Sequence, residues 1–291
     1  WSTPADQEKI GQLMGTIFRN NPNQPINVRA VDEARIFMSD DFPFMGAGDI
    51  AIVEDTSQPD CPIVACTSVW QHTWSYGGIP FGVGRPENVA TLPAYRNRGL
   101  VRALFEMFHA RSAARGDMVQ AITGIPYYYR QFGYEYVLEL SGERAIPLHA
   151  IPEARAGEQE RYHLRLATMD DVATLLALYN QSRPHSLVWH ETDERYWRYH
   201  ISGWQEPIAQ EKDAVTIGFN GRVHMIVDKN DQVCGYVWMG AKRWDEGLDV
   251  YAIQMKEGVN WQEALPCLLR LLRHHGESLL PIECNEKAFR Q

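Results

Sequence analysis

The stretch from Val89 to Arg102 joins an apolar run, a proline turn, a glycine and three arginines. This pattern predicts a strand that ends near Leu92, a short turn, and a helix that begins near Asn97. The first amides of such a helix lack intrahelical acceptors and the helix dipole adds positive charge, so this end suits a phosphate or pyrophosphate. Gly99 lets the backbone approach that ligand, and the arginines can add charge-assisted hydrogen bonds. A plain strand–helix connection with a solvated basic surface remains the alternative, because short glycine motifs often match by chance.

This stretch resembles the acetyl-CoA signature of the GCN5-related N-acetyltransferase (GNAT) family, Arg/Gln-x-x-Gly-x-Gly/Ala, which reads RNRGLV from Arg96 to Val101. Farther along, the sequence YRQFGY from Tyr129 to Tyr134 resembles the family's Tyr-x-x-Phe-Gly-Phe/Tyr segment. Two motifs in this order, joined by a predicted helix and strand, are far more specific than either one alone. Val101 departs from the small residue of the signature, as in the Eis-like (enhanced intracellular survival) branch, whose motif is similar to this one.

The resemblance implies an enzyme, an acyltransferase that moves an acetyl group from the cosubstrate acetyl-CoA to a primary amine of a small molecule or a lysine. Direct attack in a ternary complex is implied, and Cys66, on a predicted hairpin strand, has nothing to activate it as a covalent nucleophile. The cofactor-binding residues that the resemblance implies are Val89, Ala90, Thr91, Arg96, Asn97, Arg98, Gly99, Leu100, Val101 and Arg102. A non-catalytic acyl-CoA-binding or sensing protein with a GNAT fold is the alternative from another functional class.

Two residues are candidates for proton transfer. Tyr129 matches the family's tyrosine that protonates the departing thiolate of coenzyme A, a reasonable role for a nearby O–H group; aromatic packing is the alternative. The general base is less defined: Glu87 is the candidate by its position before the cofactor strand, and His72 is another. In some Eis-like enzymes the carboxylate of the chain's own C-terminus serves instead, from a sterol-carrier-like domain for which this sequence has no length.

The elements that must position these residues form a recognisable order in the first half of the chain. Helices are predicted at 5–19 and 30–38, a hairpin at 49–54 and 62–76, and further strands at 79–84 and 88–92. A long helix at 97–115, a strand at 118–123, a short helix at 126–132 and a strand at 134–139 follow. This order predicts an α/β (α+β) fold with a mixed sheet and helices on both faces.

The second half repeats the architecture, so we expect two tandem GNAT-like domains, at 1–145 and 161–291, with a proline- and glycine-containing linker at 146–160. Strands are predicted at 214–219, 223–228, 233–240, 250–255 and 280–283, with helices after Thr168, at 193–201 and at 261–274. The second copy is degenerate and ends early. Lys256–Trp261 stands where the signature would be and lacks it, so we predict no coenzyme A there. The aromatic stretch Trp189–Trp204 would line an acceptor pocket or, more simply, pack a helix.

Composition narrows the remaining choices. The formal net charge is −9, which argues against nucleic acid as a partner and favours a cationic, amine-bearing acceptor. The cysteines are scattered without a Cys-x-x-Cys pair, so we expect no metal site and a cytoplasmic location. No apolar run approaches the ~20 residues that cross a bilayer, so we expect no membrane partner. The sequence does not determine whether the protein forms a homo-oligomer.

Overall fold

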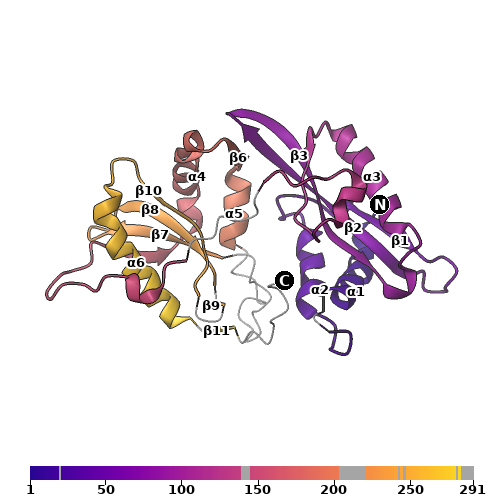
Figure 1. Cartoon of the computed structure of the whole chain (residues 1–291), viewed down its shortest axis with the longest axis horizontal. Coiled ribbons are helices and arrows are strands. Elements are labelled where there is room, and N and C mark those ends of the chain that lie inside the picture. Colours follow the sequence, from indigo (N-terminus) through magenta and orange to yellow (C-terminus); the bar gives the residue numbers. More distant parts are fainter. Residues whose placement is uncertain are drawn as a thin grey trace. The chain divides into compact units, whose positions relative to one another are not determined.

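The chain folds into two compact units, and the computed structural model describes residues 1–19, 21–138, 145–202, 221–241, 243–244, 247–279 and 281–282. Trp1–Gly142 and Ser186–Glu191 form the first unit, and Glu143–His185 and Thr192–Gln291 form the second (Figure 1). Residues 186–191, which the sequence placed in the second domain, thus belong to the first unit. The segment 146–160, expected as a linker, belongs to the second.

A mixed sheet forms the centre of the first unit. Its strands are β1 (Ile50–Glu54), β2 (Ile63–Tyr76), β3 (Ile79–Thr91), β4 (Val119–Gln120) and β6 (Val188–Glu191). The order is β1-β2-β3-β4, with β6 also paired to β2; only β3 and β4 run parallel. Gly77 and Gly78 join β2 to β3 with φ angles of 55° and 84°, as the two-residue turn of a hairpin requires.

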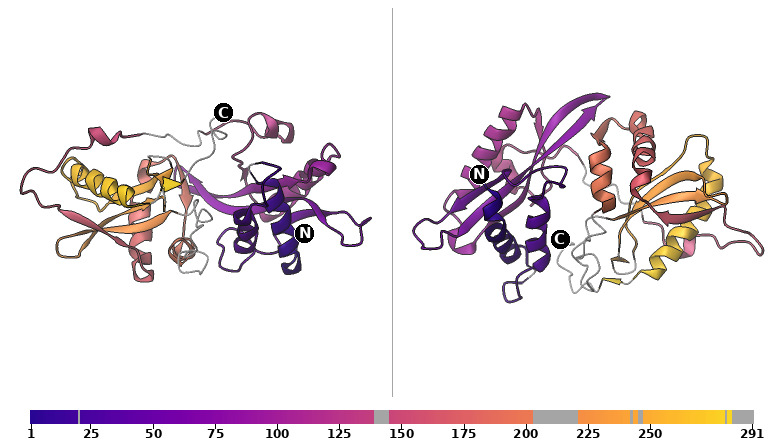
Figure 2. Two further views of the ribbon diagram at one scale, coloured as in Figure 1. Left: turned by 90° about the horizontal axis from the view of Figure 1, so that it is seen from below. Right: turned by 180° about the vertical axis from the view of Figure 1, so that it is seen from behind.

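Helices cover both faces of this sheet, as predicted (Figure 2). They are α1 (Gln7–Ile17), α2 (Val28–Phe37) and α3 (Leu100–Arg115). Successive residues of a strand point to opposite faces. On β2, Ala65 packs in the core with Leu104 of α3, whereas Trp70, on the opposite face, contacts Phe37 of α2 with ring centroids 5.1 Å apart. The paired helices α1 and α2 therefore lie on one face and α3 on the other.

Several predicted elements of the first unit differ from the structure, among them the strand expected at 118–123, of which only β4 forms. The helix expected from Asn97 begins at Leu100, and the two strands expected at 79–84 and 88–92 are one continuous strand, β3. Residues 134–138 form no strand, while residue 139 lies outside the described part. Because β4 is only two residues long, it offers little edge to pair with, and Tyr134 instead directs its hydroxyl to Gln120 Oε1 at 3.3 Å.

The second unit has the same plan. Its sheet has the order β10 (Val250–Met255), β8 (Val233–Met239), β7 (Arg222–Asp228), β5 (Tyr162–Leu166), and β9 (Arg243–Trp244) pairs with β11 (Pro281–Ile282) separately. Its helices are α4 (Val172–Gln181), α5 (Glu194–Ser202) and α6 (Trp261–Ser278). Met225 packs with α4 and α5 while the next residue, Ile226, packs with α6, so helices again cover both faces. The strand predicted at 214–219 lies outside the described residues.

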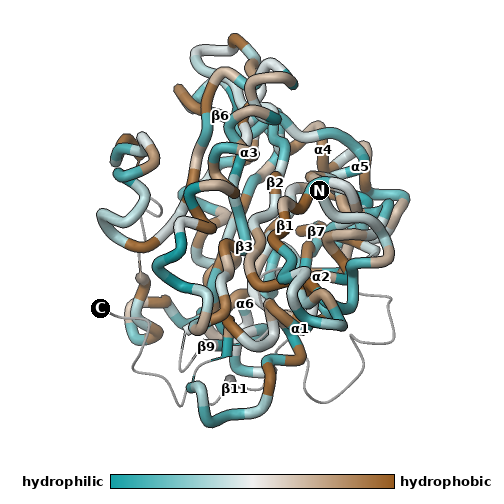
Figure 3. Tube along the Cα trace, turned by 90° about the vertical axis from the view of Figure 1, so that its right-hand side faces the viewer, coloured by the Kyte–Doolittle hydropathy of each residue, from teal (hydrophilic) through white to brown (hydrophobic). Residues whose placement is uncertain are grey.

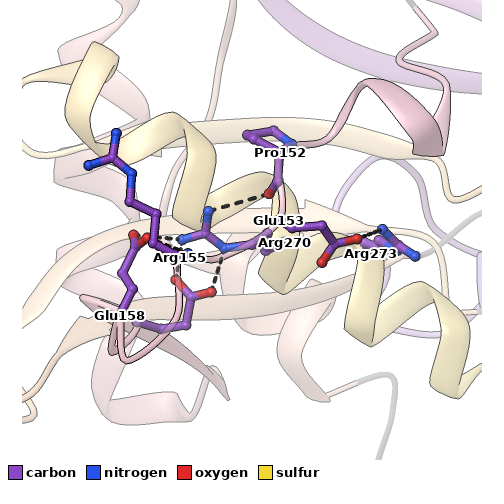
Figure 4. Close-up of polar contacts among 7 residues, drawn as sticks. Pro152, Glu153, Arg155, Glu158, Arg270 and Arg273 are labelled. Atoms are coloured by element: carbon purple, nitrogen blue, oxygen red, sulfur yellow. Dashed lines mark hydrogen bonds and ion pairs between the residues drawn. The ribbon is translucent and has the colours of Figure 1, made fainter.

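The segment 146–160 is fastened to α6 by a buried arginine (Figure 4). Arg270, whose exposed fraction is 6%, donates from Nε to Glu160 Oε1 at 2.6 Å and from Nη2 to Glu158 Oε1 at 3.2 Å. Its Nη1 donates to the carbonyl of Pro152 at 3.4 Å. A buried guanidinium needs such counter-charges, so this segment packs as part of the second unit.

Hydrophobic and hydrophilic stretches alternate along the helices and strands of both units (Figure 3). Among the described residues, no helix has both the length and the apolarity that a membrane span requires. The same residues contain no group of three or more His, Cys, Asp or Glu side chains placed to hold a metal ion.

Candidate active site

The segment between β3 and α3 forms a loop whose backbone is unusual. A short 3₁₀ helix, Pro93–Tyr95, opens it. Asn97 and Gly99 then adopt left-handed conformations, with φ angles of 61° and 75°. These two residues prevent the helix from starting at Asn97, because a left-handed residue cannot continue a right-handed helix. Gly99 serves as the N-cap of α3 and has open space where a side chain would lie.

The backbone amides of this loop are available to a ligand. Within the described part of the chain, the N–H groups of residues 97 to 102 donate to no protein acceptor; the first amide that does so is that of Ala103, to the carbonyl of Gly99 at 3.1 Å. Residues 96–99 are also exposed to solvent. Unpaired amides at the positive end of a helix dipole suit an anion such as a diphosphate. Among the described residues, no atom lies within 4 Å of a Cβ placed on Gly99.

The three arginines of the loop differ in their surroundings. Arg96 is exposed, and so is Arg102, whose guanidinium lies 5.4 Å from the centroid of the Phe132 ring. Arg98 instead folds back: its Nη2 donates to the carbonyl of Ala94 at 3.0 Å, and its guanidinium lies 4.9 Å from the centroid of the Tyr95 ring. Arg96 and Arg102 are therefore the side chains free to meet an anion at the amides.

Strands β3 and β4 separate beside this loop. They pair only at Val83 with Val119 and at Gly84 with Gln120, so in the described part of the chain residues 86–91 of β3 face no strand on that side. A β-bulge lies within the open segment: Cys66 pairs with Ala90 and Ser68 with Glu87, which leaves Asn88 and Val89 opposite Thr67.

The bulge is maintained by a left-handed residue in the middle of a strand. Asn88 has a φ of 52°, and its Oδ1 accepts a hydrogen bond from the hydroxyl of Ser68 at 3.1 Å. Bulges re-aim the side chains and amides next to them and often lie at active sites. Alternate residues of an antiparallel strand bond to its partner, so only part of the backbone from Val89 to Thr91, which is predicted to bind the cofactor, faces away from β2.

Tyr129 lies on the other side of the gap, in the 3₁₀ helix Tyr128–Phe132 that follows β4. Its half-buried ring stacks at 28° on the ring of Phe105 of α3, with centroids 5.8 Å apart. Burial, together with the nearby Tyr128 and Glu87, raises the pKa of Tyr129 to about 12. The phenol therefore keeps its proton at neutral pH, as a general acid must before it donates.

Glu87 lies on β3 in the segment that β4 does not pair with. Arg85, two residues earlier and so on the same face of the strand, donates a short hydrogen bond from Nη2 to Glu87 Oε1. Burial raises the pKa of Glu87 by more than the Arg85 charge lowers it. Glu87 and Tyr129 remain the predicted pair for proton transfer, and the charge of Glu87 is the smallest of the three causes that raise the pKa of Tyr129.

His72, the other candidate base, is unsuited to that role. It is buried, with an exposed fraction of 6%, and its Nδ1 lies 3.0 Å from Nε2 of His190 on β6. Burial and the charges of His190 and Arg85 lower the pKa of His72 to about 2. An imidazole with so low a pKa is too weak a base to accept a proton from an ammonium group near neutral pH.

Some relevant features were not foreseen. Arg85 was missed, although its spacing of two from Glu87 on a strand could have indicated the ion pair. Trp189 and His190 lie on strand β6, which pairs with β2, so they belong neither to a helix nor to the second unit. In the second unit, the loop at Lys256–Trp261 differs from that of the first: Asn260 Oδ1 accepts from the amide of Gln262 at 3.0 Å, so an amide at this helix start is already bonded.

Known proteins share this fold. Residues 3–137 match the model of the acetyltransferase (GNAT) domain. No protein of curated function matches the chain. A GCN5-related N-acetyltransferase from Kribbella flavida is similar with a TM-score of 0.60 and 20% identity, over 98% of this chain and 63% of that one.

Two further solved structures have a similar fold. A GCN5-related N-acetyltransferase from Anabaena variabilis is similar with a TM-score of 0.61 and 14% identity, over 96% of this chain and 62% of that one. Eis1 from Mycobacterium abscessus is similar with a TM-score of 0.52 and 16% identity, over 94% of this chain and 62% of that one. The chain thus spans less than two thirds of the length of each structure, and at these identities the similarity concerns the fold. The region that matches the acetyltransferase (GNAT) domain model, residues 3–137, lies within the first unit and contains the β3–α3 loop.

Proposed function

We propose that this chain is an N-acetyltransferase that transfers an acetyl group from acetyl-CoA to a primary amine, by direct attack within a ternary complex. The observation that carries the proposal is the loop before α3, where the amides of residues 97–102 have no partner among the described residues and the N-cap Gly99 is open. A phosphate-bearing ligand satisfies these amides at little cost, because they are already oriented.

The residues present fit acetyl-CoA. The amides of 97–102 would hold the diphosphate, with Arg96 and Arg102 adding charge. The unpaired edge of β3 at Val89–Thr91 would hydrogen-bond the pantetheine arm, and an amide there would polarise the thioester carbonyl. When bound, acetyl-CoA supplies an activated acyl group with a thiolate leaving group; the protein supplies binding, orientation and proton transfer.

Glu87 is the proposed base. An alkylammonium with a pKa near ~10 must lose its proton before its nitrogen can attack. Glu87 suits this better than an ordinary carboxylate, because its pKa is raised by burial and a stronger base accepts a proton more readily. Arg85 limits that rise and fixes the direction of the carboxylate through its hydrogen bond.

Tyr129 is the proposed acid. When the tetrahedral intermediate collapses, its O–H would donate to the departing sulfur. The phenol has its proton available throughout the neutral range, because its pKa is raised to about 12. The stack on Phe105 holds the ring in place, so the donor needs no reorganisation.

The acceptor is proposed to be cationic in water, in keeping with the net charge of −9. A reducing compartment such as the cytoplasm suits the four cysteines that the structure describes, Cys61, Cys66, Cys234 and Cys267, which are all free thiols.

A second candidate is a protein that binds or senses acyl-CoA without catalysis. The ion pair of Glu87 with Arg85 favours it, since the Arg85 charge makes Glu87 a weaker base than burial alone would. The two functions differ in their need for Tyr129, because a binding protein has no use for a proton donor next to the gap.

Titration calorimetry with acetyl-CoA tests the cofactor site, and a panel of amines, followed by release of free thiol, tests transfer. We expect one binding site per chain, weakened several-fold by Arg96→Ala and by added salt, as for other anion sites. Binding of acetyl-CoA without thiol release for any amine would favour the sensing function. A protein that does not respond to millimolar coenzyme A would exclude both.

A further inference from the structure

A tight turn between β1 and β2 lies against the cofactor loop. Asp55 organises this turn: its Oδ1 accepts hydrogen bonds from the amide and the hydroxyl of Ser57, at 3.0 and 2.6 Å. Its Oδ2 accepts from the hydroxyl of Tyr95 at 2.6 Å and from Nε2 of Gln58 at 2.9 Å. The carboxylate therefore joins the turn to the 3₁₀ helix that opens the loop, 40 residues farther along the chain.

The phenol of Tyr95 is the centre of this contact. Nε2 of Gln58 donates to the Tyr95 oxygen at 2.6 Å, so the hydroxyl both donates and accepts. Tyr95 and Asp55 are half-buried, although the residues on either side of Tyr95 are exposed. The hydrogen bonds lower the pKa of Asp55, and the bond to Asp55 raises the pKa of Tyr95. The ionised carboxylate and the neutral phenol thus remain paired across the neutral range.

The same turn is also attached to α1. Lys9 of α1 donates from Nζ to the carbonyls of Asp60 and Cys61, both at 3.1 Å. On its other side, the ring of Tyr95 supports the guanidinium of Arg98. Lys9 therefore fixes the turn to α1, and the Tyr95–Asp55 hydrogen bond fixes the cofactor loop to the turn.

Without Tyr95, few contacts would fix the start of this loop. The amide of Leu92 donates to Val64 at 2.9 Å, and beyond the short 3₁₀ turn follow Asn97 and Gly99, both left-handed. A glycine and a strained asparagine leave the chain with alternative conformations in the absence of outside contacts. Ordering such a loop at the moment of binding would reduce the affinity for its ligand.

We propose that Tyr95 is a positioning residue for the cofactor site: its hydroxyl, held by Asp55 and Gln58, keeps the loop in the conformation that presents the amides of 97–102. This inference rests on the proposed function, because it assigns the loop to acetyl-CoA. It adds a role for a residue that contacts no reacting atom, and it makes the β1–β2 turn part of the cofactor site.

The variant Tyr95→Phe removes the hydroxyl and keeps the ring under Arg98. We expect the Kd for coenzyme A and the KM for acetyl-CoA to rise about three- to tenfold, as for loss of one hydrogen bond of typical net strength. The kcat at saturating acetyl-CoA should stay unchanged, and the melting temperature should fall by no more than a few degrees. Tyr76→Phe, at the exposed tip of the β2–β3 hairpin, is the matched control and should alter none of these values.

A double-mutant cycle with Asp55→Ala separates positioning from general damage. If the hydroxyl acts through Asp55, adding Tyr95→Phe to Asp55→Ala raises the Kd no further. If the Kd increases of the two single variants multiply in the double variant, or if Tyr95→Phe has the wild-type Kd, the positioning role is refuted. Either result would leave the proposed function intact. A wild-type protein that does not bind coenzyme A would overturn both.

Discussion

The ring of Tyr129 lies directly against the backbone of Gly124. A Cβ placed on Gly124 would come within 2.1 Å of Cε2 and 2.6 Å of Cδ2 of that ring, closer than atoms can pack. The absence of a side chain at position 124 therefore permits the position of the phenol in the gap between β3 and β4. No feature of the cofactor motifs points to this glycine, which precedes the second motif by five residues.

Gly124→Ala should displace the Tyr129 ring and lower turnover. We expect kcat to fall about tenfold or more, since a general acid contributes roughly 10²–10⁴-fold and a displaced one loses part of this. The Kd for coenzyme A should change less than twofold, because the amides of 97–102 are untouched. Gly46→Ala is the control, since its added Cβ would meet only Asp49 Oδ2 at 3.9 Å. Equal kcat values for the two alanine variants would argue against a role for the ring position.

Tyr129→Phe tests the proton itself rather than its placement. The phenyl ring keeps the stack on Phe105, so the fold and the Kd for coenzyme A should be preserved. We expect kcat to fall on the order of 100-fold, as for loss of a general acid. The neighbouring Tyr128→Phe serves as the control in the same thiol-release assay. Wild-type turnover in Tyr129→Phe would remove the acid role and strengthen the sensing alternative.

The sequence predicted the mixed sheet of the first unit well, because its long apolar strands and the Gly77-Gly78 turn are strong local signals. It predicted the second sheet for the same reason. It could not predict that β6 joins the sheet of the first unit, since strand pairing over more than 100 residues leaves no local trace. The short β4 and the unpaired residues 134–138 were also missed, because alternation of residue types shows that a segment can form a strand but not that a partner edge exists.

At the candidate site, residue types were more predictable than geometry. The motif around Gly99 indicated an anion-binding loop, but the left-handed Asn97, which delays the helix to Leu100, follows from backbone conformation alone. Glu87 and His72 were comparable as bases in the sequence. Only burial and the contact with His190 distinguish them, and both depend on the folded chain.

The ion pair of Arg85 with Glu87 makes a prediction about pH. A base must be ionised to accept a proton, so kcat/KM should fall as the pH drops through the raised pKa of Glu87. The Arg85 charge lowers that pKa, so Arg85→Gln should raise it further and move the acidic limb of the pH profile to higher pH. Arg35→Gln, in an exposed pair on α2, should leave the limb in place. A limb that moves to lower pH would contradict the role of Glu87 as the base.

The imidazole pair of His72 and His190 should make the first unit sensitive to acid. Burial and the charges of His190 and Arg85 lower the pKa of His72 from 6.5 to about 2, and burial and the Arg85 charge lower that of His190 to about 4 although Glu191 opposes them. The unfolded chain therefore takes up these protons first, and the free energy of unfolding falls as the pH drops below 6.5.

The variant His72→Phe tests this. It keeps a ring for the stack on Phe44, whose centroid lies 4.2 Å away, and it removes one of the two buried imidazoles. Between pH 7 and pH 5, its loss of unfolding free energy in urea should be smaller than that of the wild type by about 1–2 kcal/mol. His149→Phe, which replaces an exposed histidine of the second unit, should lose as much as the wild type, and an equal loss in His72→Phe would show that the buried pair does not remain neutral in the folded protein.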